Sequence, residues 1–189
     1  DVDYINFRIK RRYLPFFLSR KLKPDDFSQE SAVLRVVMGP QDDMFDRQGI
    51  ETFLSREYTV TSDFDRMGCR LEGPFIAQKA SMDMISDGIA YGSVQVPSHG
   101  KPIILLSDRQ TTGGYPKIAT VASVDIPKLV QRKTDHRIRF EAIRVQEAQK
   151  LYLEEERAYE KMRNEIHVPC KEVLDCRLVA KRVSKLFTG

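Results

Sequence analysis

Residues 107–117 gather an acid, two cations, an amide, two adjacent threonines and two adjacent glycines in eleven consecutive positions. Asp108 could act as a general base or orient an amide, and Lys117 or Arg109 could neutralise a carboxylate or a phosphate. Such polar density is typical of loops that carry function. The segment is therefore a candidate site for a small molecule, with Asp108 and Lys117 as its candidate catalytic residues.

The glycines of this segment point to the same chemistry. Gly113 and Gly114 can adopt backbone conformations closed to other residues, so their N–H groups could approach a carbonyl or anionic oxygen. Thr111 and Thr112 add hydroxyl donors. A tight turn in which Asp108 and Arg109 pair with each other or with the backbone fits the same residues, and composition does not choose between the two interpretations.

Other familiar sites are missing from the sequence. Tyr115 follows the glycines where a phosphate-binding Walker loop has lysine, so no nucleotide site is expected. His167, Cys170 and Cys176 lack the fourth ligand and the paired cysteine spacing of a structural zinc site, so no metal is expected. Residues 86–88 offer a hydroxyl and a carboxylate without a histidine, and we predict a turn between strands there.

Composition excludes several classes of protein. With 41% hydrophobic and 31% charged residues among 189, the chain can bury a core. No apolar run approaches the roughly 18 to 20 residues of a membrane span, so no membrane association is expected. Basic clusters within residues 8–23 and 171–185 lack aromatic residues on a common face, so we expect no nucleic-acid binding. Three cysteines form a sparse set that favours the reducing cytoplasm.

The elements that must position these residues are mainly short strands. Runs rich in β-branched and aromatic residues, separated by Gly, Pro, Asp or Ser, predict strands at 32–38, 58–61, 69–71, 91–96, 102–107, 118–124 and 137–143. A short helix is expected at 48–56. Many short strands at this spacing favour a closed or nearly closed β architecture.

Two stretches carry particular patterns. Residues 137–143 alternate polar and apolar, which predicts a strand with one face on the core. Residues 103–106 are apolar throughout, so we expect this strand to be buried on both faces and to deliver Asp108 to a defined place.

Helical periodicity begins at Val145 and continues to Ile166, with apolar residues at spacings of three and four. A second amphipathic segment follows at 174–187. Packing of this second segment on its own domain is the expected arrangement, and contact with a second copy or a partner is the alternative. The helix from Val145 to Ile166 would suit a partner surface.

Several ordered blocks resemble the biotin-dependent carboxyltransferase family, which includes the C subunit of 5-oxoprolinase, also called allophanate hydrolase subunit 2. The blocks are GPQDDMF at 39–45, DRMGCRLEG at 65–73, SDGI at 86–89, GSVQVP at 92–97, GKPIILL at 100–106, DRQTTGGYPK at 108–117 and IATV at 118–121. The resemblance spans residues 33–149 and implies a cyclophilin-like β-barrel. The fold class we expect is thus mainly β, a cyclophilin-like barrel with a C-terminal helical extension.

The resemblance also implies a domain organisation. Family members are close to twice this length, so the chain is expected to be a C-terminal half that lacks an N-terminal half of related fold. Residues 1–31 would then connect to that missing half, residues 32–150 would form the carboxyltransferase-family domain, and residues 151–189 would form the helical extension.

The activity that the resemblance implies is ATP-dependent opening of the lactam 5-oxoproline to glutamate, performed with partner subunits. This chain alone would bind no cofactor and ATP would act through the complex, so the isolated chain is expected to be inactive. One alternative is biotin-dependent carboxyl transfer to urea or a similar amide, and another is a non-catalytic regulator that antagonises a sporulation kinase inhibitor.

On the family interpretation, the substrate is a small planar amide. Gln95 and Gln110 would recognise it, Asp108 would accept its N–H, and Lys117 or Arg66 would supply a counter-charge. The remaining substrate-binding candidates come from the 108–117 block: Arg109, Thr111, Thr112, Gly113, Gly114 and Tyr115. A purely structural role for the aspartate, the arginines and the glycines is the competing interpretation.

Overall fold

The computed structural model describes residues 6–7, 18–19, 29–79 and 86–167 of the chain. The chain divides into two compact units, Asp26–Arg157 and a second unit made of Asp1–Asp25 with Ala158–Gly189. In the second unit, the short strands β1 (Asn6–Phe7) and β2 (Leu18–Ser19) pair antiparallel. All residues of the candidate site belong to the first unit.

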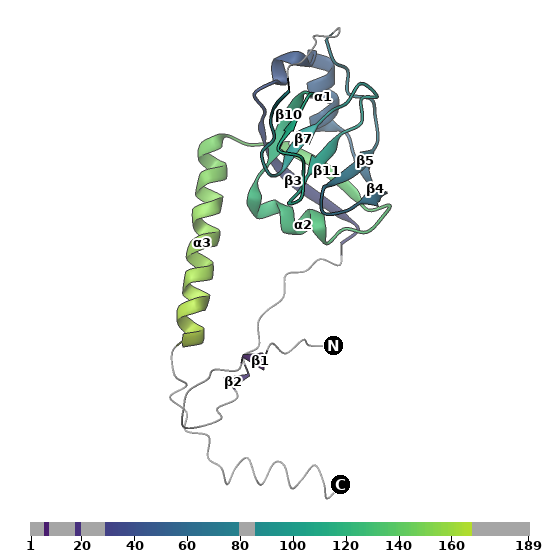
Figure 1. Ribbon diagram of the computed structural model, residues 1–189. Coiled ribbons are helices and arrows are strands. Elements are labelled where there is room, and N and C mark those ends of the chain that lie inside the picture. The colour runs from purple at the N-terminus through teal and green to yellow at the C-terminus, as the bar shows by residue number, and fades with distance from the viewer. Residues whose placement is uncertain (1–5, 8–17, 20–28, 80–85, 168–189) are drawn as a thin grey trace, which may run out of the picture. The chain divides into compact units, whose positions relative to one another are not determined.

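The first unit is built on a closed barrel (Figure 1). Around the barrel the strands follow the order β10, β3, β11, β4, β5, β8 and β7, and β7 pairs with β10 to close it. Their bounds are β3 Ser31–Met38, β4 Tyr58–Phe64, β5 Gly68–Glu72, β7 Ser93–Gln95, β8 Ile103–Leu105, β10 Lys117–Val121 and β11 Arg137–Ala142. Neighbours run antiparallel except β3 and β11, which are parallel. The predicted β-barrel with a C-terminal helix is confirmed.

The core of the barrel is apolar and centres on an aromatic cluster. Phe53 stacks on Phe140 with ring centroids 4.3 Å apart, and Tyr58 lies 5.7 Å from Phe140. Phe53 belongs to α1 (Arg47–Ser55), so this helix is anchored to the barrel by its buried aromatic side chain. Such aromatic pairs contribute about 0.5–1.5 kcal/mol each beyond the burial of their area.

The helix α1 begins where its sequence provides a cap. Asp46 accepts a hydrogen bond from the Gly49 N–H at 2.5 Å, which satisfies one of the first backbone donors of the helix. A Cβ atom at Gly49 would lie 2.2 Å from the Ala77 carbonyl oxygen, so glycine lets the helix pack closely on the chain beside it. The helix predicted at 48–56 is confirmed with a shift of one residue at each end.

Every strand predicted from the pattern has a counterpart in the barrel, but one of them, at residues 103–106, is less buried than predicted. The strand β8 alternates, with Ile104 and Leu106 buried and Ile103 and Leu105 only partly covered. The prediction that this run is buried on both faces is therefore wrong. A barrel has one interior, so apolar residues on the outer face of a strand stay partly exposed.

Some elements were not predicted. Asp87–Gly88 forms the strand β6, which pairs with β9 (Thr112–Gly113), so the prediction of a turn at 86–88 is wrong. A 3-10 helix, η2 (Ser123–Asp125), leads into α2 (Ile126–Val130) after β10. These elements are only two to five residues long and carry no periodicity that a sequence pattern could reveal.

The last described helix is α3 (Val145–His167). Its apolar residues Val145, Tyr152 and Leu153 are each about half exposed, at 50%, 48% and 52%. The predicted helical segment at 174–187 and most of the two basic clusters lie outside the described residues. Within the described parts of the chain, no helix is both long enough and apolar enough to span a membrane.

One buried carboxylate joins the barrel to its outer helix. Asp125, at the end of η2, is fully buried and accepts hydrogen bonds from the Arg35 backbone N–H at 2.9 Å and from its guanidinium at 2.6 and 2.7 Å. Lys128 of α2 adds an ion pair at 2.7 Å. Burial raises the pKa of Asp125, but the hydrogen bonds from Arg35 and Lys128 outweigh it, and the pKa lies below its ordinary value.

We predict that Asp125→Asn lowers the free energy of unfolding by about 2 kcal/mol, because the fully buried side chain loses its charge while Arg35 and Lys128, whose side chains are 26% and 44% exposed, lose their counter-ion. Urea unfolding followed by circular dichroism measures this. Asp63, which forms an exposed 3.4 Å ion pair with Arg70, provides a control: Asp63→Asn should change stability by no more than about 0.5 kcal/mol. Equal effects of the two substitutions would contradict the role of Asp125.

The same carboxylate predicts an acid dependence of stability. Because the folded pKa of Asp125 is below the value of about 3.9 in an unfolded chain, its contribution is complete above about pH 5. It is lost as the pH falls through the lowered folded pKa. The free energies of unfolding of the wild type and of Asp125→Asn should therefore converge as the pH is lowered from 6 to 2. A difference between the two that does not change with pH would exclude this contribution.

Candidate functional site

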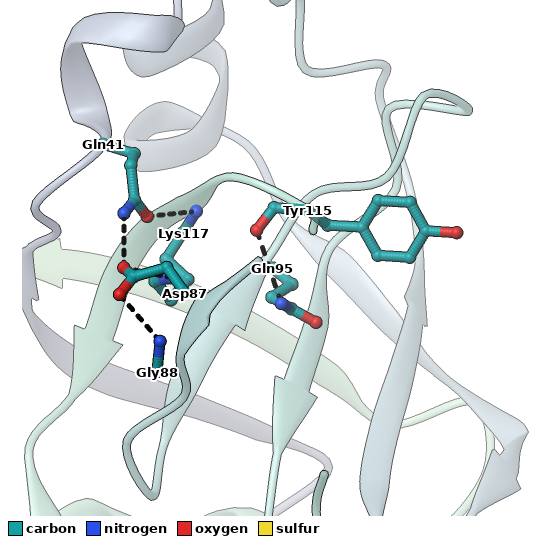
Figure 2. Close-up of polar contacts among 6 residues, drawn as sticks. All are labelled: Gln41, Asp87, Gly88, Gln95, Tyr115 and Lys117. Carbon is teal, nitrogen blue, oxygen red and sulfur yellow. Dashed lines mark hydrogen bonds and ion pairs between the residues drawn. The ribbon is translucent and has the colours of Figure 1, made fainter. Parts of the chain in front are cut away.

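The closure of the barrel brings two predicted site residues together. Gln95 ends β7 and Lys117 begins β10, and the antiparallel register places them opposite each other. Both are buried, with 5% and 3% of their surfaces exposed. The Gln95 Nε2 donates a hydrogen bond to the Tyr115 carbonyl oxygen at 3.3 Å (Figure 2), and Tyr115 as a whole residue is 52% exposed.

Lys117 is held in a ring of three residues. Its Nζ donates to the Asp87 Oδ2 at 2.9 Å, and its backbone N–H donates to the Gln41 Oε1 at 3.2 Å. The Gln41 Nε2 closes the ring by donating to the same Asp87 Oδ2 at 2.9 Å (Figure 2). The Gly88 N–H adds a bond to the Asp87 Oδ1 at 2.7 Å. Three separate segments of the chain thus meet at one carboxylate.

The electrostatics of the ring follow from these contacts. The ion pair with Lys117, helped by Gln41 and the Gly88 N–H, holds the pKa of Asp87 below its ordinary value. Asp87 is therefore a carboxylate at neutral pH. It offsets the positive charge of a lysine whose side chain is only 4% exposed.

Gln41 reaches this ring because the backbone before it approaches β10 closely. Gly39 donates its N–H to the Ile118 carbonyl oxygen at 2.8 Å. A Cβ atom at position 39 would lie 2.3 Å from the Lys117 carbonyl oxygen, a distance that no side chain tolerates. Glycine is thus required for the chain to pass this strand before η1 (Asp42–Met44) begins.

The pair of glycines in the 107–117 segment acts differently from our expectation. Among the described glycines, positive φ angles occur at Gly92 and Gly100, so neither Gly113 nor Gly114 uses the left-handed region. Gly113 instead provides space, because a Cβ atom there would lie 2.9 Å from Ile89 Cδ1 and 3.1 Å from Gln95 Nε2. Its role is to let β9 lie against Gln95.

The other catalytic candidate belongs to a separate polar group. Asp108 forms a two-point contact with Arg66, with Nε–Oδ2 and Nη2–Oδ1 distances of 2.9 and 3.1 Å. The Arg66 side chain is 81% exposed and that of Asp108 is 48% exposed. Of the pairings expected for a purely structural turn, the one between Asp108 and Arg109 is not found, whereas pairing with the backbone is. Arg109 instead donates to the backbone carbonyl oxygens of Ile89 and Leu106 at 3.0 and 3.2 Å, and thereby fixes the start of the segment.

The remaining predicted residues line the surface beside these groups. Gln110, Thr111, Thr112 and Gly114 are exposed, and Gly113 is partly buried. Thr112 and Gly113 form β9, whose partners Gly88 and Asp87 are the residues next to Lys117. The structure thus brings the end of this segment to the Lys117 ring.

Sequence reasoning missed Gln41 and Asp87 as members of the site. Both lay inside blocks that carried the family resemblance, in GPQDDMF and SDGI, and this was the available signal. Gln41 and Asp87 are 46 positions apart, and no spacing rule connects them with Lys117.

An open depression of about 610 Å³ lies elsewhere on the barrel unit and contains none of the predicted site residues. It is lined by Asp42, Asp43, Phe45, Arg47, Ile50, Glu51 and Lys79. Its lining carries charges of both signs but none of the candidate catalytic or substrate-binding residues named from the sequence, so we place the candidate site at the Lys117 ring.

The model of a family described as "Carboxyltransferase domain, subdomain A and B" matches residues 7–142 of the chain. This protein belongs to the carboxyltransferase-domain family. The match includes Gln41, Asp87, Gln95 and Lys117, so the whole of the candidate site lies within the family domain. The helix α3 begins just after it, at Val145.

Two curated relatives of this carboxyltransferase-family chain bear the same name. The C subunit of 5-oxoprolinase from Haemophilus influenzae is 44% identical over 119 residues, which are 63% of this chain and 38% of that protein. The C subunit of 5-oxoprolinase from Escherichia coli is 34% identical over 134 residues, 71% of this chain and 43% of that protein. The chain therefore matches less than half the length of either relative.

A solved structure supports the fold. The urea carboxylase of Kluyveromyces lactis superposes with a TM-score of 0.69 at 21% identity, over 76% of this chain and 14% of that protein. At this identity the similarity concerns the fold of the carboxyltransferase domain alone.

We predict that Gly39→Ala destabilises the protein by about 1–3 kcal/mol, because the added methyl group forces the backbone away from Lys117. Thermal or urea unfolding measures the loss. Gly88→Ala is the matched control, since a Cβ atom at position 88 would meet no atom within 4 Å. If the two variants unfold alike, close approach at Gly39 is not what positions this loop.

Proposed function

We propose that this chain forms part of the C subunit of an ATP-dependent 5-oxoprolinase, which opens the lactam ring of 5-oxoproline to glutamate together with partner subunits. Sequence identities of 44% and 34% to two proteins that are named as this subunit support the proposal. Since the chain matches only 38% and 43% of their lengths, the complete subunit would include a further half.

The observation that carries the proposal is the pairing of Lys117 with Gln95 where the barrel closes. Opening a lactam breaks the C–N bond of an amide, and negative charge develops on the carbonyl oxygen as water adds. An ammonium group with 4% exposure is a strong donor toward such an oxygen, because little water competes with it. The Gln95 side chain beside it can both donate and accept, as an amide substrate requires.

The other residues take supporting roles in this proposal. Asp108 would accept the N–H of the substrate, and Arg66, which it contacts, would supply a counter-charge for the substrate carboxylate. Arg109 acts through the loop, because its guanidinium is bound to backbone carbonyl groups. Amide recognition and donor roles at the surface are assigned to Gln110, Thr111, Thr112, Gly114 and Tyr115, and Gly113 contributes the space beside Gln95.

We assign ATP to the complex and not to this chain. A phosphate site needs several backbone N–H groups directed at one point, whereas Thr112 and Gly113 pair with β6 as a strand. Tyr115 then continues toward β10, where a Walker loop would begin a helix. The described residues of this segment therefore do not fit a triphosphate, and no step of the reaction is routed through ATP here.

Carboxyl transfer is a second candidate function, because the matching family model is described as a carboxyltransferase domain. The acceptor would be urea or a similar amide, and carboxybiotin would be the carboxyl donor and thus a substrate. Both candidates need a planar amide at Gln95 and Lys117. They differ in the product, which is glutamate in one case and a carboxylated amide in the other.

The proposal predicts that the complete subunit, assembled with its partners, converts 5-oxoproline to glutamate only in the presence of ATP. Lys117→Met should reduce kcat/KM by about 100-fold or more, since one electrostatic donor to a developing oxyanion contributes about 10²–10³-fold. A coupled assay of glutamate release, run with and without ATP, measures the ATP dependence and the kcat/KM of the wild type and of Lys117→Met.

Lys101→Met is the matched control for this experiment. Lys101 also forms an ion pair, with Glu72 at 2.5 Å, but its side chain is 30% exposed and lies outside the ring at Lys117. The complex that carries Lys101→Met should keep the kcat/KM of the wild type. An active complex whose Lys117→Met variant retains full turnover would remove Lys117 from the site, and carboxylation of urea without glutamate formation would favour the second candidate.

A further inference from the structure

Lys117 carries a charge in a place that offers it little water. Its side chain is 4% exposed at the first position of β10, so its ammonium group needs a partner within the protein. Among the described residues, the Asp87 Oδ2 at 2.9 Å is the acceptor for Nζ. The direction in which this ammonium points therefore depends on where Asp87 is held.

Asp87 is held more firmly than an ordinary surface carboxylate. Its side chain is 54% exposed, and exposed ion pairs usually sample many geometries. Here the carboxylate also accepts from the Gly88 N–H and from the Gln41 Nε2, so both of its oxygens are fixed. Charge-assisted bonds from several donors give a defined geometry that one ion pair lacks.

Gln41 provides a function that only an amide of this length supplies. Its Oε1 accepts from the Lys117 backbone N–H at 3.2 Å while its Nε2 donates to Asp87 at 2.9 Å. Glutamate at this position could accept but not donate, and it would place a second negative charge beside Asp87. Gln41 therefore fixes the Asp87 carboxylate relative to the backbone of Lys117, the residue whose ammonium group that carboxylate binds.

We infer that Asp87 and Gln41 are positioning residues that fix the ammonium group of Lys117 for the substrate. The inference rests on the proposed function, because that proposal is what places Lys117 at the substrate. Asp87 occupies one of the three N–H directions of the ammonium group and so sets the other two. Neither Asp87 nor Gln41 needs to touch the substrate for this.

The test compares Asp87→Asn, Asp87→Glu and Gln41→Glu in the assembled enzyme with 5-oxoproline. A misplacement of about 1 Å can cost 10²-fold, so kcat/KM should fall about 10- to 100-fold in Asp87→Asn and Gln41→Glu. Asp87→Glu keeps the charge on a longer side chain and should recover part of the activity lost in Asp87→Asn. Recovery that depends on charge distinguishes positioning of an ammonium group from a merely structural contact.

A second measurement reads the position of Lys117 without turnover. In this 189-residue chain with ¹⁵N-labelled lysine, an enclosed and ion-paired ammonium group exchanges its protons slowly enough to give a side-chain NMR signal. The Lys117→Met variant assigns that signal. We expect it in the wild type and in the control Asp63→Asn, and we expect its loss in Asp87→Asn and Gln41→Glu.

These outcomes separate the two proposals. If the wild-type complex does not open 5-oxoproline, the proposed function fails, while the lysine signal still decides whether Asp87 and Gln41 hold Lys117. If Asp87→Asn and Gln41→Glu keep kcat/KM within about twofold of the wild type, or keep the lysine signal, the positioning role is overturned. If Asp87→Asn does not fold, Gln41→Glu gives the decision alone.

Discussion

The pairing of β7 with β10 is the constraint on which the site depends. Closing a sheet into a barrel removes its two open edges, whose unpaired N–H and C=O groups would otherwise face solvent. In this chain the closing ladder places Gln95 opposite Lys117. The same backbone hydrogen bonds that complete the fold therefore also bring the amide and the ammonium group into one place.

The burial of Lys117 creates a second requirement. A charge with 4% exposure has to be compensated within the protein, and the compensation comes from β6, a strand of only two residues that is paired with β9. Gln41 is hydrogen-bonded to both members of this pair, and Gly39 makes its approach to β10 possible. A change that releases the carboxylate would therefore also leave the ammonium group of Lys117 uncompensated.

The regular part of the fold could be predicted from local pattern. Alternation in residues 137–143 identified β11, and the β-branched run at 32–38 identified β3, because these side chains meet one apolar interior. The parallel pairing of β3 with β11 could not be predicted, since nothing in either strand records its neighbour. The two-sided burial expected for 103–106 failed for a related reason: apolar composition does not say how much cover the outer face of a barrel receives.

The amino-acid sequence by itself determined the strands of the barrel, the longer helices, the chemical types in residues 107–117 and, through its ordered blocks, the family. Tertiary structure decided which of those chemical groups meet. Lys117 and Asp108 lie nine positions apart in one segment, yet each has a different partner, Asp87 in one case and Arg66 in the other. Periodicity reports only whether a side chain faces the core, whereas a hydrogen-bonded ring across residues 41, 87 and 117 depends on strand register and on barrel closure. Those are properties of the folded chain as a whole, and no local pattern encodes them.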